Sequence, residues 1–310
     1  MPLSWAADFC GPQLAREIFL RKLITTPALL LPGMLLAESP NQVPKPAAGQ
    51  LTLTYFDAAG VSNLENNDAE IIQLDTHLKL PIASHGDLAQ GLWLYQLNFR
   101  EREFRSRHTD PVQKQRLYDI SVPISYVIRN SNTSHWVFNI SPGVKSSLEY
   151  VGSDDLAVNA VAQYSSKGQY HGYNLGLVYT HRFGEGKFVP LMNYRYRSGK
   201  TISMVVGFPY SRLSYAPSFG QHYFAKLTPE GGSWHVYNQG NKKQSYQFEQ
   251  QGFRLGLGAE YQLTGPLWLG AEAGVQFNQQ LTLDNDQGQS GTLELEDSNY
   301  LQLTAKLRFR

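Results

Sequence analysis

The chain has 310 residues, with 27 Lys and Arg against 26 Asp and Glu, and only 17% of its residues are charged. The balanced charge argues against a protein that binds nucleic acid or another polyanion, because such proteins carry a basic surplus. The 18 Tyr, 15 Phe, 5 Trp and 27 Gly favour β-strands joined by tight turns. The mean hydropathy of −0.36 argues against membrane-spanning helices but not against a transmembrane barrel, in which only every second strand residue is apolar.

The N-terminus predicts a secretory signal peptide. Arg21 and Lys22 precede an apolar run that ends at Ala37, and this run is shorter than the ~20 residues that span a bilayer. We therefore predict a signal peptide over residues 1–37. Its basic residues lie unusually far from Met1, which suggests that residues 1–20 are an over-called start. The only cysteine, Cys10, lies inside it, so the mature chain would hold no disulfide. The proline-rich residues 38–49 predict a periplasmic linker.

From residue 50 onward, apolar and polar residues alternate with the period of a β-strand. Fourteen candidate strands follow, or twelve if the two short ones at 51–56 and 233–238 are omitted. The candidates cover 51–56, 70–82, 91–103, 116–129, 135–147, 155–164, 171–183, 187–197, 200–216, 219–228, 233–238, 250–263, 267–279 and 299–309. The four longest connections, at 57–69, 104–115, 239–249 and 280–298, then fall on one side, as the long outer loops of bacterial barrels do.

The candidate strands at 250–263, 267–279 and 299–309 show which side chains should face outward and which should face the lumen. We expect six apolar side chains to point outward: Leu255, Leu257, Leu269, Ala271, Leu303 and Leu307. The strand at 299–309 ends in Phe309, like the terminal strand by which outer-membrane barrels are recognised for insertion, although Arg310 follows it. The alternative is an amphipathic strand of a soluble β-protein whose apolar core lies between two sheets.

These patterns together predict an all-β protein, a closed antiparallel up-and-down transmembrane β-barrel of 12–14 strands over residues 50–310. The expected location is the cell outer membrane of a Gram-negative bacterium. The expected partners are outer-membrane lipids and lipopolysaccharide, together with the barrel-assembly machinery, which would bind the C-terminal strand. No nucleic-acid partner is expected, and the sequence does not identify a soluble ligand.

One segment departs from plain alternation. Residues 207–217, Gly-Phe-Pro-Tyr-Ser-Arg-Leu-Ser-Tyr-Ala-Pro, are followed by Gly-Gly-Ser-Trp-His-Val at 231–236. The pair resembles the motifs of the DUF6268-type family of uncharacterised bacterial outer-membrane β-barrels. The resemblance implies the fold and the location but no activity. Pro209 in mid-strand predicts a kink. The kink is either structural or forms a constriction or a binding ledge inside the barrel, to which Arg212 and Trp234 contribute.

Charged residues on the predicted inner face are the candidate functional residues. An Arg or Lys facing lipid at mid-depth would cost ~2–4 kcal/mol, so we expect these side chains to line the lumen. They are Arg129, Arg182, Arg195, Arg197, Arg254, Glu260, Glu272, Lys306 and Arg308, with Asp75 and Lys79 in the same class. They form either a network of mixed sign that fills a narrow barrel or the wall of a pore, in which Arg195, Arg197 and Arg254 form a basic side that Glu260 and Glu272 partly neutralise.

No catalytic motif accompanies this pattern. The eight histidines are scattered singly, and neither a catalytic residue, a metal site nor a cofactor is predicted. Solvated loop acids explain Asp154, Asp155, Asp284 and Asp286 better than a calcium site does. The sequence thus favours a narrow channel or solute-binding barrel without catalytic activity. The alternatives are a plugged scaffold barrel and an outer-membrane lipid-modifying enzyme, which would need a Ser/His or His/acid pair within hydrogen-bond reach.

Overall fold

The computed structural model describes residues 49–63, 69–107, 114–199, 201–238, 241–285 and 290–308. The predicted signal peptide and the linker up to residue 48 lie outside the described residues, as do Phe309 and Arg310. Among the described residues, no helix is long and apolar enough to cross a membrane.

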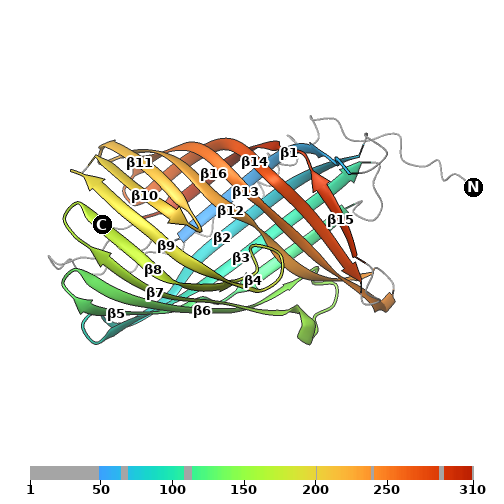
Figure 1. Ribbon diagram of the computed structural model, residues 1–310, viewed down its shortest axis with the longest axis horizontal. Coiled ribbons are helices and arrows are strands. Elements are labelled where there is room, and N and C mark those ends of the chain that lie inside the picture. The colour runs from blue at the N-terminus through green and yellow to red at the C-terminus, as the bar shows by residue number, and fades with distance from the viewer. Residues whose placement is uncertain are drawn as a thin grey trace, which may run out of the picture. The chain divides into compact units, whose positions relative to one another are not determined.

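Sixteen strands and one short 3-10 turn, η1, make up the described chain (Figure 1). The elements are β1 (Gly49–Gly60), β2 (Glu70–Asp87), β3 (Gly91–Arg107), β4 (Lys114–Ser121), β5 (Ile124–Ser131), β6 (Ser134–Ser146), η1 (Ser153–Asp155), β7 (Leu156–Lys167), β8 (His171–Thr180), β9 (Lys187–Ser198), β10 (Ile202–Phe208), β11 (Ser211–Ser218), β12 (Gln221–Asn238), β13 (Asn241–Thr264), β14 (Leu267–Asn285), β15 (Ser290–Leu295) and β16 (Ser298–Leu307).

The strands close into a barrel of fourteen antiparallel strands. β4 and β5 both pair with β3 and β6, so they are one strand interrupted at Pro123, which cannot donate a ladder hydrogen bond. β15 and β16 both pair with β14 and form another interrupted strand. The ring closes where β1 pairs with β16, from Gly49 opposite Leu307 to Phe56 opposite Tyr300. The predicted fold class and strand number are confirmed.

Two predicted strand assignments were wrong, and the two errors cancel in the number of strands. The segment 200–216 is not one kinked strand but the hairpin β10–β11, which turns at Pro209 and Tyr210. Conversely, 219–228 and 233–238 belong to a single strand, β12. The predicted loop at 239–249 is also largely strand, because β13 begins at Asn241.

The outer face of the barrel is apolar toward the end where the short turns lie. Leu255, Leu257 and Leu269 are 52%, 68% and 43% exposed. A row of exposed or partly exposed aromatic side chains follows the short-turn rim: Trp93, Tyr126, Trp136, Tyr164, Tyr173, Tyr194, Tyr215, Tyr223 and Tyr261. An apolar band edged by aromatic residues is typical of a transmembrane barrel. The six residues predicted to point outward lie on this apolar face. Glu272 and Gln302 alternate with them along the strands and therefore face the lumen.

Toward the other end, the polarity of the two faces inverts. Along β13 the outward row runs from Leu257 and Leu255 through Phe253 to Gln251 and Glu249, and thus changes from apolar to polar. The inward row of β13 changes from polar at Arg254 to apolar at Phe248. In β1 and β14 a bulge turns apolar residues inward: the register shifts between Phe56 and Ala59 in β1, and Asn278 adopts a φ of 51° in β14. One extra residue exchanges the faces of a strand.

We call the inverted part the cap and the rest the lower barrel. The cap comprises residues 57–63, 69–73, 103–107, 114–118, 144–155, 231–238, 241–251, 278–285 and 290–296. Its interior is a cluster of buried side chains contributed from all around the ring: Ala59, Val61, Ala69, Ile71, Phe104, Leu117, Trp234, Val236, Phe248, Leu281 and Leu295. Three of the predicted long outer loops, at 57–69, 104–115 and 280–298, thus contain strand extensions that build this apolar core.

The cap has fewer strands than the lower barrel. Strands β7 to β11 do not enter it, and it closes where β12 meets β6 through one parallel bridge, His235 opposite Ser146. Nine strands form the cap ring: β1, β2, β3, β4, β6, β12, β13, β14 and β15. Figure 1 shows these strands extending to the right beyond β9, β10 and β11.

The cap core yields a first prediction. Phe248 is fully buried and packs against Phe104 and Trp234, with ring centroids 5.1 and 6.3 Å apart. Replacing Phe248 with Ala should cost ~3–5 kcal/mol, because the cavity cannot collapse within a closed ring. Backbone amides of β12 and β13 in the cap should therefore exchange with deuterium at least about 100-fold faster.

The matched control is Leu257→Ala, in the same strand but on the outer face of the lower barrel, where it is 68% exposed. This change should leave the exchange of the cap amides unaltered. Equal exchange in both variants would contradict an independently packed core in the cap.

Candidate solute-binding lumen

The interior of the lower barrel is polar and carries an excess of basic side chains. Five carboxylates face it from the described strands, and each forms an ion pair: Asp75, Asp119, Glu230, Glu260 and Glu272. Several lumen cations form no ion pair with a described residue. They include Lys79, Arg129, Arg182, Arg195, Arg197 and Arg212. The field in the lumen is therefore positive, although the whole chain is nearly neutral.

A dense ion-pair layer lies directly beneath the cap core. The carboxylate of Glu230 accepts hydrogen bonds from Arg100, Arg102 and Arg254, and Asp75 accepts from Arg100 Nε at 2.8 Å. Arg102 is fully buried, and its guanidinium stacks 5.0 Å from the Trp234 ring of the core. Charges at this depth are stable only because they are paired, so the layer closes the lumen on the cap side.

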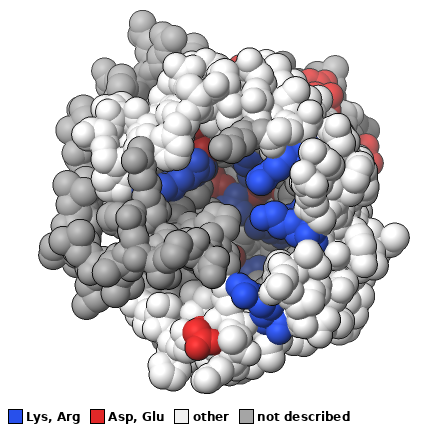
Figure 2. Space-filling view, turned by 90° about the vertical axis from the view of Figure 1, so that its left-hand side faces the viewer, with Lys and Arg blue, Asp and Glu red and all other residues white. Residues whose placement is uncertain are grey.

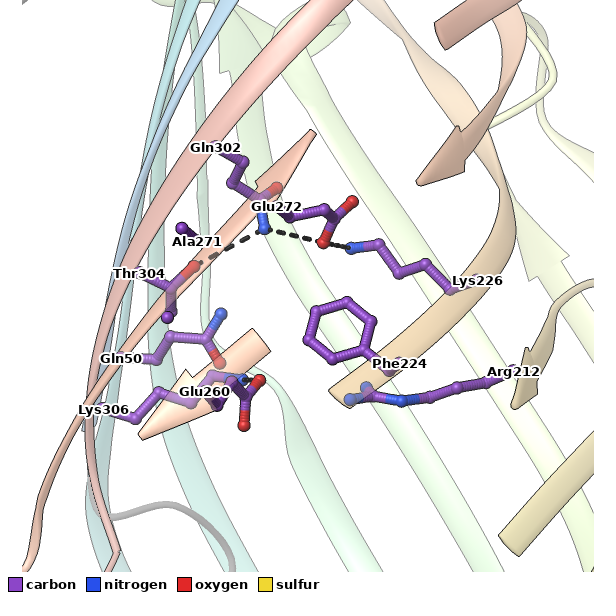
Figure 3. A pocket seen from close by; sticks show the side chains of 11 residues that line it. Gln50, Arg212, Phe224, Lys226, Glu260, Ala271, Glu272, Gln302, Thr304 and Lys306 are labelled. Atoms are coloured by element: carbon purple, nitrogen blue, oxygen red, sulfur yellow. Dashed lines mark hydrogen bonds and ion pairs between the residues drawn. The ribbon is translucent and has the colours of Figure 1, made fainter. Parts of the chain in front are cut away.

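Between this layer and the short-turn rim, the lumen contains a cavity of about 200 Å³. Arg212, Phe224 and Lys226 project into it from β11 and β12, facing a wall of β1, β14 and β16 (Figure 3). On that wall, Glu272 pairs with Lys226 at 2.7 Å, and Glu260 of β13 accepts from Lys306 at 2.6 Å. The cavity therefore holds both charges, but its acids are already neutralised.

Arg212 is the cation of this cavity that has no carboxylate partner among the described residues. Its guanidinium lies over the Phe224 ring, 4.3 Å from the centroid, and Nε donates to Ser214 Oγ at 3.2 Å. Its Nη2 is buried and has no hydrogen-bond partner within the described ranges of the chain. A planar guanidinium held by an aromatic ring, with donors unused, is suited to binding a carboxylate or phosphate.

The lumen opens at the short-turn end. Figure 2 looks into this end and shows a hollow with Lys and Arg side chains around it and few acidic ones. Arg195 and Arg197 lie on this part of the wall, in β9, opposite Val205 and Ser203 of β10. Arg195 Nε is 3.1 Å from the side-chain amide of Asn174. A solute that enters here would meet basic side chains before it reached the cavity.

The family model described as domain of unknown function DUF6268 matches residues 52–301. The chain belongs to the DUF6268 family. This confirms the resemblance carried by the motifs at 207–217 and 231–236. A search of curated proteins found no similar sequence.

Several solved structures of membrane barrels are similar to this DUF6268 chain. The COG4313 outer membrane channel from Pseudomonas putida F1 is 8% identical, with 88% of this chain and 100% of that chain covered and a TM-score of 0.45. The NanC porin is 9% identical, with 84% and 100% covered and a TM-score of 0.39. The TodX monoaromatic hydrocarbon channel deltaS2 mutant is 9% identical, with 86% and 91% covered and a TM-score of 0.36. At TM-scores this low, these similarities carry no weight for the function.

The residues predicted to line the lumen occupy four different places in the DUF6268 barrel. Glu260, Glu272, Lys306 and Arg308 surround the cavity, where Arg308 Nη2 donates to Glu260 at 2.7 Å. Arg129, Arg195 and Arg197 lie nearer the short-turn rim. Arg254 lies apart from Arg195 and Arg197, in the ion-pair layer, where its partner is Glu230, and Arg182 lies in the β8–β9 turn.

The family motif does not form a constriction around one point. Pro209 is part of the β10–β11 turn, and Arg212 faces the cavity. Trp234 is buried in the cap core, where its Nε1 has no hydrogen-bond partner among the residues that the structure describes. The motif therefore contributes to both the lower barrel and the cap.

Five side chains of the ion-pair layer and the cavity were not predicted: Arg100, Arg102, Phe224, Lys226 and Glu230. Glu230 fell between two candidate strands that are in fact one strand, so its inward position was not visible. Arg100 and Arg102 stand two residues apart within the strand at 91–103, and this spacing was the available signal for a shared face.

A histidine and an acid do lie close together, but without a nucleophile. His235 Nδ1 is 3.3 Å from Asp155 Oδ1 in the cap, and this contact ties η1 to β12. Ser146 lies beside His235 in the sheet, but its hydroxyl donates to the Tyr150 carbonyl. In the described part of the chain no hydrogen bond joins His235 to a serine, and no group of His, Cys, Asp and Glu could hold a metal ion.

The ion-pair layer yields a second prediction. Glu230→Gln should cost ~3–5 kcal/mol of unfolding free energy, because Arg100, Arg102 and Arg254 would lose their common counter-ion inside the barrel. Urea titration of the purified protein, followed by tryptophan fluorescence, measures this loss. Asp154→Asn, an exposed acid of η1, removes the same charge and should shift the midpoint little. A Glu230→Gln midpoint equal to that of the wild type would show that the layer does not support the fold.

Proposed function

We propose that this protein is an outer-membrane barrel that binds small anionic solutes and conducts them as a narrow channel, without catalysing a reaction. The observation that carries the proposal is the Arg212 guanidinium over Phe224, which has no carboxylate partner among the described residues, inside a lumen whose five described carboxylates all form ion pairs. An anion there would gain charge-assisted hydrogen bonds without displacing an existing ion pair.

The orientation in the membrane follows from the turns. In bacterial barrels the short turns face the periplasm, so the basic opening would face the periplasm and the cap would face the exterior. Outer-membrane lipids and lipopolysaccharide would contact the apolar band and its aromatic edge. The barrel-assembly machinery would recognise the C-terminal strand, which ends the ring beside β1.

The basic wall would attract and orient the solute. Arg195 and Arg197 line the path from the rim, and Lys226 and Lys306 lie at its end, where Glu272 and Glu260 hold them in place. Walls of one charge sign enclosed by a low-dielectric barrel concentrate ions of the opposite sign. The solute would be small, because the cavity measures about 200 Å³.

A plugged scaffold barrel is the second candidate, since the cap core and the ion-pair layer close the axis. It would leave the unused donors of Arg212 without a role. A lipid-modifying enzyme has less support, because the His235–Asp155 pair faces no serine hydroxyl among the described residues and lies in the cap, away from the apolar band.

The third prediction concerns selectivity. Purified protein in planar bilayers under a salt gradient should show a reversal potential that indicates anion preference. Arg195→Glu and Arg212→Glu should each lower the anion-to-cation permeability ratio, by about threefold or more, because each reverses a lumen charge. In parallel, titration calorimetry should show that Arg212→Glu abolishes phosphate binding.

The control is Lys114→Glu, which makes the same charge change on the exposed outside of the cap and should alter neither quantity. Absence of both conductance and phosphate binding in the wild type would reject the proposed function in favour of a scaffold. Turnover of phospholipid or lipopolysaccharide would favour the enzyme instead.

A further inference from the structure

The channel cannot run along the barrel axis. Phe104, Leu117, Phe248 and Leu281 fill the cap and are at most 1% exposed, and the ion-pair layer beneath them is bonded across the lumen from Arg102 to Glu230. An anion on this path would have to cross a dry apolar core, at a cost of many kcal/mol. If the proposed function holds, the outer opening must lie elsewhere.

The wall itself is incomplete at the junction of the cap and the lower barrel. The ladder between β11 and β12 ends at Ser211 opposite Leu227. The next strand neighbour of β12 on that side is β6, at His235 opposite Ser146. Residues 228–234 of β12 therefore have no strand partner on this side, because the β8–β9 and β10–β11 hairpins end below them.

The β8–β9 turn, residues 181–186, fills this gap. A Cβ at Gly231 of β12 would collide with the carbonyl oxygens of both Gln250 and Arg182, so the turn presses directly on β12. Among the described residues no backbone hydrogen bond joins the turn to β12. Side-chain and van der Waals contacts alone hold the wall closed here, unlike the hydrogen-bonded ladders around the rest of the ring.

The two sides of the turn differ in chemistry. Phe183 contacts Phe208 and Phe253 with ring centroids 5.8 and 6.4 Å away, on the side of the apolar band. On the cap side the turn meets Glu249, which belongs to the polar outer face. The gap therefore faces water just above the apolar band, and the three phenylalanines form its lower edge.

Behind the turn lies the basic lumen. The Arg182 side chain is exposed and makes no ion pair with a described residue, yet it lies close enough to Glu230, Arg100 and Arg254 to interact with them electrostatically. An unpaired cation thus stands where the gap meets the lumen. It would attract an anion passing between the cavity and the exterior.

We infer that the β8–β9 turn is a gate over a side portal, through which small anionic solutes pass beneath the cap. The inference rests on the proposed channel function and adds its route: in at the short-turn opening, past Arg212, and out beside Arg182. Moving the turn breaks no backbone ladder, whereas opening the axis would require the cap core to unfold.

A reversible cross-link tests the gate. An ideal Cβ at Gly184 lies 3.9 Å from Glu249 Cβ, within the range of disulfides, so Gly184→Cys with Glu249→Cys should lock the turn to β13. The native Cys10 is replaced by Ser. Oxidation should lower the single-channel conductance in planar bilayers at least about tenfold, and dithiothreitol should restore it.

Three controls isolate the effect of the bridge. Gly184 has a φ of +82°, so Gly184→Cys alone carries the same backbone strain without a cross-link, and Glu249→Cys alone carries the same charge loss. Thr282→Cys with Thr292→Cys bridges neighbouring strands of the cap, where the hydroxyl oxygens are 3.2 Å apart, without crossing the gap. None of the three should respond to oxidation.

A second variant acts in the opposite direction. Phe183→Ala removes the contacts with Phe208 and Phe253 and should raise the open probability. Anion conductance that is equal in the oxidised and reduced double variant would overturn the side portal while leaving the channel and its basic lumen intact. A wild type that neither conducts nor binds phosphate would overturn the proposed function and the portal together.

Discussion

The structure depends on one constraint: a strand residue that faces lipid must be apolar, and a strand residue that faces water must be polar or be covered. While the strands lie in the bilayer, this puts Leu255 and Leu257 outside and Arg254 inside. Once β13 leaves the apolar band, the outside becomes water, and Gln251 and Glu249 replace them. The apolar residues then move inward, where Phe248 forms a core. The cap is thus the ordinary consequence of strands that continue beyond the membrane.

The reduction from fourteen strands to nine follows from this core. A fourteen-stranded ring encloses a space too wide for single layers of side chains to fill, whereas rings of about eight strands can be filled. Strands β7 to β11 stop at the junction, and the remaining ring is narrow enough to pack. An odd number of strands cannot alternate in direction all the way round, so one neighbouring pair must be parallel. That pair is β6 and β12, and its single bridge at His235 leaves the unpaired edge of β12 below it.

Features that depend on the local alternation of apolar and polar residues could be predicted from the sequence. The positions at which a bulge exchanges the inner and outer faces of a strand could not. The outward rows around Leu257 and Leu269, the polar rows that face the lumen, and a barrel of 12–14 strands all follow from a period of two. The exact number of fourteen does not, because one segment predicted as a strand is a hairpin and two predicted strands are one. The bulges at Phe56 and Asn278 are invisible to that period, because the apolar residues stay at odd positions on both sides while their direction reverses. Segments that build the cap were therefore assigned to loops. Glu230 lay between the candidate strands 219–228 and 233–238, in a segment wrongly assigned to a loop. Its inward position, and with it the ion-pair layer, was therefore not predicted.

The lumen is basic because charges of the two signs are unevenly distributed in space, and not because of the net charge of the chain. The chain carries 27 basic and 26 acidic residues, and this balance hides an uneven distribution in space. Glu249 and Glu294 lie on the outer face of the cap and are partly or fully exposed. Glu103 lies on the same face, where Arg105 and Arg116 pair with it and cover it. In the described part of the chain, each lumen carboxylate neutralises a neighbouring cation, and Arg195, Arg197 and Arg212 have no carboxylate partner. Because a barrel wall screens poorly compared with water, these few cations dominate the potential along the lumen, so a nearly neutral protein can still present a strongly basic interior to an anion.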